Sequence, residues 1–215
     1  MRLLTSPISN GFLTDDDIFV RTLLISLFLM TLFLPAAGAR QFRPLSGNGV
    51  LIIRPLNPEF PVAPGPIPLY RDPGVARIAE RPAGEIPRLS SILNTPAGEY
   101  PLAVMRKKGN WLLIAYDDAG REGWMEMARW WNYTSWDDFL KGRVLRLLPD
   151  LNKGVYALRS GPSATAPQTG TPPVKNSLRI IDVTDDWVLV VADSGQQGWL
   201  RWRDGDGRFL VSLEP

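Results

Sequence analysis

Two stretches of this chain follow the same pattern, and together they decide its fold. The first is Trp111-Leu-Leu-Ile-Ala-Tyr-Asp-Asp-Ala-Gly-Arg-Glu-Gly123-Trp124, and the second is Trp187-Val-Leu-Val-Val-Ala-Asp-Ser-Gly-Gln-Gln-Gly198-Trp199. Each begins with Trp and an apolar strand, turns at a segment that contains Gly, and resumes at Gly-Trp. A pattern that recurs in order and spacing predicts two copies of one β-unit, which favours small binding barrels over a catalytic fold.

Further strands extend each copy towards its N-terminal side. Short β-type runs begin at Gly49 and Gly142, and apolar runs at 100–105 and 178–183 precede the two Trp-initiated strands. A tight turn that contains Gly109 joins 100–105 to the strand that begins at Trp111. We therefore expect an all-β protein with two tandem small antiparallel barrels.

The two units differ in their loops and are joined by a short connector. About a dozen extra residues are expected in the first unit, around residues 81–95. Ser135 and Asp138 have the spacing of a helix capping box, and Gly142 can end the helical turns that follow. The expected organisation is a signal peptide at 1–39, an N-terminal segment at 40–48, a first domain at 49–132, a helical connector at 133–141 and a second domain at 142–215.

The composition excludes many kinds of catalytic site. The chain has no Cys and no His, so thiol nucleophiles, Ser-His-Asp triads, disulfides and Cys or His zinc sites are ruled out. Carboxylate chemistry remains open, but Asp117-Asp118 and Asp185-Asp186 lie at expected β-turns, where Asp is common for backbone reasons. The run Asp204-Gly-Asp-Gly207 begins like a calcium loop but is better explained as a hairpin turn. We expect a non-catalytic protein with no metal and no cofactor.

The N-terminal region has the pattern of an export signal. Residues 22–34 are an uninterrupted apolar run, shorter than the roughly 20 residues of a membrane span. Ala37 and Ala39 supply small residues for cleavage after Ala39. The expected location is periplasmic or extracellular, and the alternative is an uncleaved N-terminal anchor. The formal net charge of +2 is too weak to predict nucleic-acid binding.

The second unit resembles the bacterial SH3 (SH3-like) domain family. The motifs that carry this resemblance are Arg159-Ser-Gly-Pro-Ser163, Asp186-Trp187 and Gly198-Trp199-Leu, in that order. The first unit is similar at Trp111 and at Gly123-Trp124, but has Arg71-Asp-Pro-Gly in place of Arg-Ser-Gly-Pro. The resemblance implies two SH3-like barrels of the kind found in exported bacterial proteins, where they bind cell-wall peptide or proteins.

Four aromatic residues are the candidate ligand contacts. Trp111 and Trp187 follow a turn, so their indole faces are as well placed to line a groove as to pack in a core. Tyr70 and Tyr156 lie beside the loop that forms one wall of the ligand groove in the family that the chain resembles. Burial with a satisfied hydroxyl is the alternative for both tyrosines. Trp124 and Trp199 are expected to be framework residues.

Three other groups of residues have a structural interpretation beside a functional one. An aromatic cluster in the connector is expected to hold the two barrels together, and consists of Trp130, Trp131, Tyr133 and Trp136. A basic hairpin tip at residues 106–108 is expected to be a solvated turn. The proline-rich segment 55–68 is expected to be a spacer and loop wall, although polyproline segments are also ligands for other modules.

These observations predict a binding or adaptor module of the bacterial cell envelope. Its grooves would recognise peptidoglycan peptide, and two competent barrels on one polymer would multiply the affinity. The alternative is a structural scaffold subunit of an envelope protein complex that binds protein partners through an exposed strand edge.

Overall fold

The computed structural model describes residues 43–57, 64–173 and 175–214. The expected signal peptide and the first residues of the expected N-terminal segment lie outside the described residues. Among those that are described, no helix is long and apolar enough to cross a membrane.

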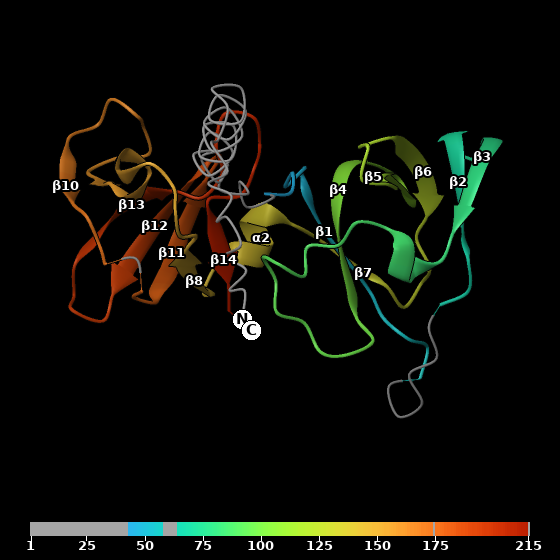
Figure 1. Cartoon of the computed structure of the whole chain (residues 1–215), viewed down its shortest axis with the longest axis horizontal. Helices are drawn as coiled ribbons and strands as arrows, with labels where there is room; N and C mark the ends of the chain where they lie inside the picture. The colour runs from blue at the N-terminus through green and yellow to red at the C-terminus, as the bar shows by residue number, and fades with distance from the viewer. Residues whose placement is uncertain (1–42, 58–63, 174, 215) are drawn as a thin grey trace, which may run out of the picture. The chain divides into compact units, whose positions relative to one another are not determined.

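The described chain is all-β and forms two antiparallel sheets of seven strands each (Figure 1). The first sheet contains β1 (Gly49–Ile53), β2 (Ile67–Asp72), β3 (Val75–Arg81), β4 (Tyr100–Lys108), β5 (Trp111–Ala115), β6 (Glu122–Glu126) and β7 (Asn132–Ser135). The second contains β8 (Val144–Leu147), β9 (Leu158–Arg159), β10 (Gln168–Gly170), β11 (Leu178–Thr184), β12 (Trp187–Ala192), β13 (Gln197–Arg201) and β14 (Val211–Leu213). Three short helical segments accompany them: η1 (Ala83–Glu85), α2 (Trp136–Leu140) and η2 (Lys153–Tyr156).

The two sheets have the same strand order. The first runs β3-β2-β6-β5-β4-β1-β7, and the second runs β10-β9-β13-β12-β11-β8-β14, which is the first order with seven added to every number. The pairing registers also correspond, because Leu113 pairs with Trp124 in the first sheet and Leu189 pairs with Trp199 in the second. The sequence repeat is therefore a repeat of topology and of strand register, and we call the two units the first and second repeats.

The hairpin between β4 and β5 is longer than the sequence predicts. β4 continues through Lys108, so the basic residues 106–108 belong to a strand and the turn is confined to Gly109 and Asn110. Gly109 has a φ of 60°, a backbone conformation that glycine adopts without the steric cost of a Cβ atom. Lys107 lies over the ring of Tyr133, with its Nζ 5.5 Å from the ring centroid.

The connector has the predicted helix, but the first sheet reaches further than the predicted domain boundary. β7 pairs with β1 and ends at Ser135. The first sheet therefore includes residues 133–135, which the sequence analysis assigns to the connector. Ser135 caps α2 by accepting a hydrogen bond from the backbone N–H of Asp138 at 3.3 Å. Gly142 follows with a φ of 78°, as the sequence predicts for the end of the helix.

The extra loop of the first repeat belongs to the core of the second. This loop, residues 82–99, joins β3 to β4, and it buries Leu89, Ile92 and Leu93 in the same apolar cluster as strands of the second sheet. Leu93 forms a bridge with Leu213 of β14, and the backbone N–H of Leu213 donates to the carbonyl of Ile92 at 2.7 Å. The first repeat therefore supplies part of the apolar cover of the second.

The N-terminal segment also joins the second repeat. Leu45 bridges to Arg208, and the backbone N–H of Ser46 donates to the carbonyl of Gly207 at 2.8 Å. Arg203 donates from its guanidinium to the carbonyl of Gly47 at 2.9 Å. Residues 43–47 thus lie along the last loop of the second repeat before the chain enters β1.

Candidate functional site

The four candidate contacts occupy matched elements of the two repeats. Trp111 and Trp187 are the first residues of the equivalent strands β5 and β12, and both are half-buried. Tyr70 lies in β2, half-buried, whereas Tyr156 ends the η2 turn. The tryptophans are therefore equivalent in position, but the tyrosines are not.

Tyr156 is a buried structural residue. Its hydroxyl donates to the carbonyl of Leu148 at 2.7 Å and accepts from the backbone N–H of Leu151 at 3.0 Å. Only 6% of the residue is exposed, so neither the ring nor the hydroxyl is presented to a ligand. The alternative left open by the sequence, burial with a satisfied hydroxyl, describes Tyr156.

In the first repeat, the indole of Trp111 is engaged by a neighbouring ring. Tyr70 packs against it edge-on, with ring centroids 5.4 Å apart and an interplanar angle of 89°. This T-shaped geometry is a favourable one for aromatic pairs. Trp111 pairs across the sheet with Glu126, and Tyr70 pairs with Trp124. The structure therefore brings two of the four candidates together, in contact with each other.

The second repeat has arginines at the corresponding positions. Trp187 pairs with Arg201, which takes the place of Glu126, and Trp199 pairs with Arg159, which takes the place of Tyr70. The guanidinium of Arg201 lies 5.9 Å from the centroid of the Trp187 ring, within the range of a cation–π contact. The two repeats thus present the same tryptophan with different chemistry around it.

The register corrects one part of the sequence alignment. The sequence comparison matches Arg71 with Arg159, but it is Tyr70 that pairs with the Gly-Trp strand as Arg159 does. A register shift between Leu69 and Tyr70 in the pairing of β2 with β3 accompanies the one-residue difference.

Trp187 lines a cavity of about 440 Å³ in the second repeat. This volume lies within the usual range of small-ligand sites. The apolar part of its lining comes from Leu151, Val155, Ala157, Ala164, Trp187 and Leu210. The charged part comes from Arg43, Arg159, Arg201 and Asp204. We call this cavity the Trp187 pocket.

Asp186 forms ion pairs with Arg201, which lines the pocket, and with Arg203. Its two carboxylate oxygens accept from Nε of Arg203 at 2.5 Å and from a terminal nitrogen of Arg201 at 3.4 Å. Arg203 is also the side chain that holds the carbonyl of Gly47. The carboxylate directly before Trp187 therefore orients Arg201 beside the indole and anchors the N-terminal segment.

Asp204 is held as a carboxylate on the other side of the pocket. Partial burial raises its pKa, but hydrogen bonds from the backbone N–H of Arg208, from Arg43 and from the backbone N–H of Asp206 outweigh burial and place the pKa below its ordinary value. The Arg43 guanidinium lies 2.9 Å from this carboxylate. Asp204 is thus a turn residue with an arginine partner, as the hairpin interpretation of residues 204–207 predicts.

Sequence reasoning proposed Trp187, which the structure places in this cavity, but did not propose the arginines around it as candidate site residues. The signal for Arg201 was present, because it follows the second Gly-Trp by two residues where the first repeat has Glu126. Arg159 was noticed only as part of the Arg-Ser-Gly-Pro motif. No local pattern indicates Arg43, which reaches the pocket through the long-range pairing of the N-terminal segment.

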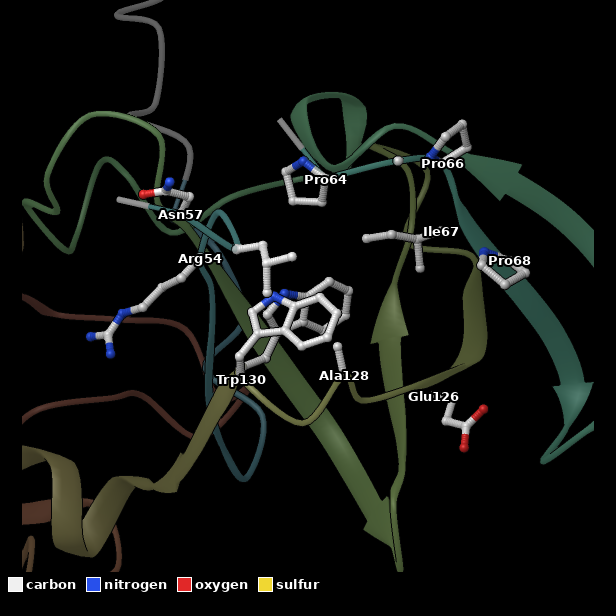
Figure 2. A pocket seen from close by; sticks show the side chains of 12 residues that line it. Arg54, Asn57, Pro64, Pro66, Ile67, Pro68, Glu126, Ala128 and Trp130 are labelled. Atoms are coloured by element: carbon white, nitrogen blue, oxygen red, sulfur yellow. The ribbon is translucent and has the colours of Figure 1, made fainter. Parts of the chain in front are cut away.

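A larger pocket, of about 640 Å³, lies in the first repeat (Figure 2). Pro64, Pro66 and Pro68 form part of its lining, so this portion of the proline-rich segment is a loop wall. Trp130 also lines it and is 52% exposed. None of the four candidate contacts lines this pocket. Residues 58–63, which join two of its lining segments, lie outside the described residues.

The remaining aromatic residues divide between framework and surface. Trp124 is buried, and Trp199 is half-buried in β13. Within the connector cluster, Trp136 is buried among Phe139, Trp202 and Phe209, and its Nε1 donates to the carbonyl of Ser46 at 2.8 Å. Trp136 therefore links the N-terminal segment, α2 and the second repeat. The other members of the cluster do not share this position, because Trp131 and Tyr133 pack against the first core and Trp130 is exposed.

The described residues do not gather a cluster of side chains that could hold a metal ion. No group of three or more His, Cys, Asp or Glu side chains comes together within this part of the chain. Of the two Asp pairs considered from the sequence, Asp117 bonds to Arg121 at 2.5 Å, and Asp186 bonds to two arginines. These carboxylates have structural partners. Comparisons with protein-family models and with curated proteins give no match for this chain.

Proposed function

We propose that this protein is a non-catalytic binding module of the bacterial cell envelope, with two SH3-like barrels, and that it recognises cell-wall peptide. The observation that carries the proposal is the Trp187 pocket, where a half-buried indole, apolar walls and arginines surround one cavity. Ligand sites commonly combine apolar lining with a few polar groups that fix orientation. The SH3-like assignment is supported by short antiparallel strands repeated in the same order around two apolar cores.

The proposed mechanism is the insertion of a peptide side chain against the Trp187 indole. An indole loses little conformational freedom on binding and offers a large apolar face. The adjoining arginines then hydrogen-bond polar groups of the peptide. In the first repeat, Tyr70 already packs on Trp111, so the equivalent face is less open to a ligand.

Sedimentation with insoluble peptidoglycan sacculi tests this function. The protein is used from Arg40 onward, a form that contains the whole compact unit Arg43–Pro215. We expect the sacculi to deplete it from solution at modest salt, and we expect Trp187→Ala to weaken that depletion at least tenfold, since a buried aromatic anchor is worth about 2 kcal/mol or more in binding. The matched control is Trp111→Ala, the same substitution at the equivalent strand position. Absence of pelleting by the unaltered protein would reject the proposal.

Export is part of the proposal and has its own test. The apolar run at residues 22–34 and the small residues before Arg40 support cleavage after Ala39. Mass spectrometry of the protein recovered from an envelope fraction should give a mature chain that begins at Arg40. A protein recovered only with residues 22–34 attached would favour the anchor instead.

A scaffold that binds a protein partner is the second candidate, and the edge of the first sheet favours it. β3 is an edge strand of seven residues, with Val75 62% exposed, whereas its counterpart β10 has only three residues. A long exposed edge is a template for pairing with a strand of another chain. Ile78 lies in the same edge strand and is 39% exposed. Recovery of a protein partner that Ile78→Lys releases, together with no binding to sacculi, would transfer the assignment to this function.

A further inference from the structure

We propose that the Trp187 pocket binds the free C-terminal carboxylate of a peptide whose last side chain is small and apolar. This inference rests on the proposed function and adds the chemical group that the same pocket selects. It is carried by the arginines that replace Tyr70 and Glu126 in the second repeat.

Two arginines of the pocket have N–H groups available for a ligand. Arg159 donates to the carbonyl of Ala166 at 2.7 Å, and Arg201 makes one long contact of 3.4 Å with Asp186. A guanidinium has five N–H donors, so both keep donors without an acceptor among the described residues. Nε of Arg201 is buried and has no hydrogen-bond partner within the same part of the chain. Because this Nε is closed to solvent, a ligand is bound by the terminal nitrogens of Arg201, whose side chain is 35% exposed.

The two arginines lie on adjacent strands. Arg159 ends β9 and Arg201 ends β13, and β9 pairs with β13 through Trp199. Both side chains line one cavity. Guanidinium groups bind carboxylates through parallel N–H···O bonds, which gives this arrangement a preference for a planar anion.

The acidic residues near the pocket are already paired with other cations. Asp186 bonds to Nε of Arg203 at 2.5 Å and makes only the longer contact of 3.4 Å with Arg201, and Asp204 bonds to Arg43 at 2.9 Å. Their charges are therefore largely offset by Arg203 and Arg43, which leaves Arg159 and Arg201 to attract an anion. A carboxylate is expected to be preferred over a phosphate because the apolar wall beside the arginines takes an attached side chain, which a simple phosphate ester does not supply.

The apolar lining defines what is attached to the carboxylate. Val155 and Ala157 flank the buried Tyr156, and together with Leu151 they give the cavity an apolar wall. The Trp187 indole completes it beside Arg201. A carboxylate next to an apolar side chain fits this combination, and the C-terminal residue of a peptide has both.

The first repeat lacks this chemistry, so a single carboxylate site is expected. Glu126 is exposed at the position of Arg201, and Tyr70 covers Trp111 at the position of Arg159. An acidic side chain at this place repels a carboxylate instead of binding it.

The test compares two forms of one probe peptide on the protein from Arg40 onward. N-acetyl-alanyl-alanine with a free carboxylate, its C-terminal amide and methyl phosphate are each titrated while the indole N–H signals of the tryptophans are followed by NMR. The free acid should shift the Trp187 signal and bind about tenfold or more tightly than the amide, because hydrogen bonds to charged groups are the strong ones. Methyl phosphate should bind more weakly than the acid.

Matched variants separate this site from surface charge. Arg201→Met and Arg159→Met keep much of the apolar stem and should each weaken binding of the acid about tenfold, with the other indole signals unchanged. Arg179→Met is the control, since Arg179 is exposed on β11 outside the pocket, and it should change binding less than about twofold.

Each other outcome overturns the inference in a recognisable way. Equal binding of acid and amide at Trp187 would reject the preference for a carboxylate, but it would be consistent with a pocket that binds peptide. Tighter binding of methyl phosphate would make the pocket a phosphate site. No shift of Trp187 with any probe would reject the carboxylate site, while the sacculus experiment would still decide the proposed function independently.

Discussion

The two repeats share a strand order but differ at the positions that surround their equivalent tryptophans. Around Trp111 the chain places Tyr70 and Glu126, and around Trp187 it places Arg159 and Arg201. The residues that fix the register, Gly-Trp and the strand that precedes it, are kept in both. The two repeats therefore share a scaffold while the side chains beside their tryptophans differ, and function has to be argued for each repeat separately.

The repeats also differ in what they contribute to each other. The extra loop of the first repeat, residues 82–99, buries its apolar residues in the core of the second, and Val50 and Ile52 of β1 join the same cluster. The N-terminal segment supplies Arg43 to the Trp187 pocket. The first repeat thus supplies part of the core of the second, and the N-terminal segment supplies part of its pocket.

The largest expected effect concerns the shared core. Trp136→Ala should destabilise the protein by about 3–5 kcal/mol, since it removes a buried indole that packs on Phe139, Trp202 and Phe209. Urea unfolding followed by circular dichroism gives the free energy. Because the second core includes parts of the first repeat, the transition should be single. Two separate transitions would show that the repeats are independent.

A matched tryptophan provides the control for that prediction. Trp130→Ala removes a side chain that is 52% exposed, and the loss should stay below about 1 kcal/mol. Equal losses for the two variants would contradict the difference in burial on which the prediction depends.

The next largest effect is on peptide affinity, and it comes from reversing the charge at Arg201, the position where the first repeat has Glu126. Arg201→Glu gives the second repeat the residue that the first carries, and it should weaken binding of an acid-terminated peptide about a hundredfold, or roughly 2.7 kcal/mol, because it replaces attraction by repulsion. Isothermal titration calorimetry measures the change. The reciprocal control, Glu126→Arg, alters the first repeat by the same kind of charge reversal and should leave this affinity within about twofold. If both variants bind as the unaltered protein does, the distinction between the sites is wrong.

A smaller effect on stability tests whether Tyr70 packs against the indole of Trp111. A double-mutant cycle with Tyr70→Leu and Trp111→Leu should give a coupling of about 0.5–1.5 kcal/mol in the free energy of unfolding, as edge-to-face aromatic pairs do. The equivalent cycle with Arg159→Leu and Trp187→Leu should give less. Equal couplings in the two repeats would argue against a special contact in the first.

The smallest effect depends on pH and involves Asp204. Its pKa in the folded protein lies below the ordinary value of 3.8, so its ionised form stabilises the folded state above that pH. This contribution is lost as the pH falls through the lower folded-state pKa. Asp204→Asn should therefore cost at most about 1 kcal/mol near neutral pH and less near pH 2. Thermal unfolding of the variant and the unaltered protein at both pH values measures the difference in their stability, which should be smaller at the lower pH.

The sequence predicted the parts of the fold that depend on local patterns. The Trp and Gly-Trp repeat located β5, β6, β12 and β13, because apolar runs bounded by glycine turns are a local signal. The helix was also predictable, since Ser135 and Asp138 form a local cap. The extra loop was found by counting residues between equivalent motifs.

Long-range pairing could not be predicted in the same way. Nothing in residues 82–99 indicates that Leu89 and Leu93 pack in the core of the other repeat, because a short apolar loop has no period that identifies its partner. The register shift between Leu69 and Tyr70 was also not predicted, because a bulge moves the register by one residue without any marker in the sequence.

The residues that line the Trp187 pocket were predicted only in part, for the same reason. Trp187 was proposed because it follows a turn, and Tyr156 because it lies beside a loop, but Tyr156 is buried. Only the cross-strand partners distinguish Trp187 from Trp111, and those partners are set by pairing in the sheet. The arginines of the pocket therefore became visible as a group only in three dimensions.

The central claim is that the second repeat binds through Trp187 while the first, at Trp111, does not. The most direct measurement is the sedimentation of Trp187→Ala and Trp111→Ala with sacculi, side by side and over one range of sacculus concentration. Our account predicts that Trp187→Ala needs at least tenfold more sacculi for half-depletion and that Trp111→Ala stays within about twofold of the unaltered protein. Equal losses in both variants, or a loss confined to Trp111→Ala, would contradict it.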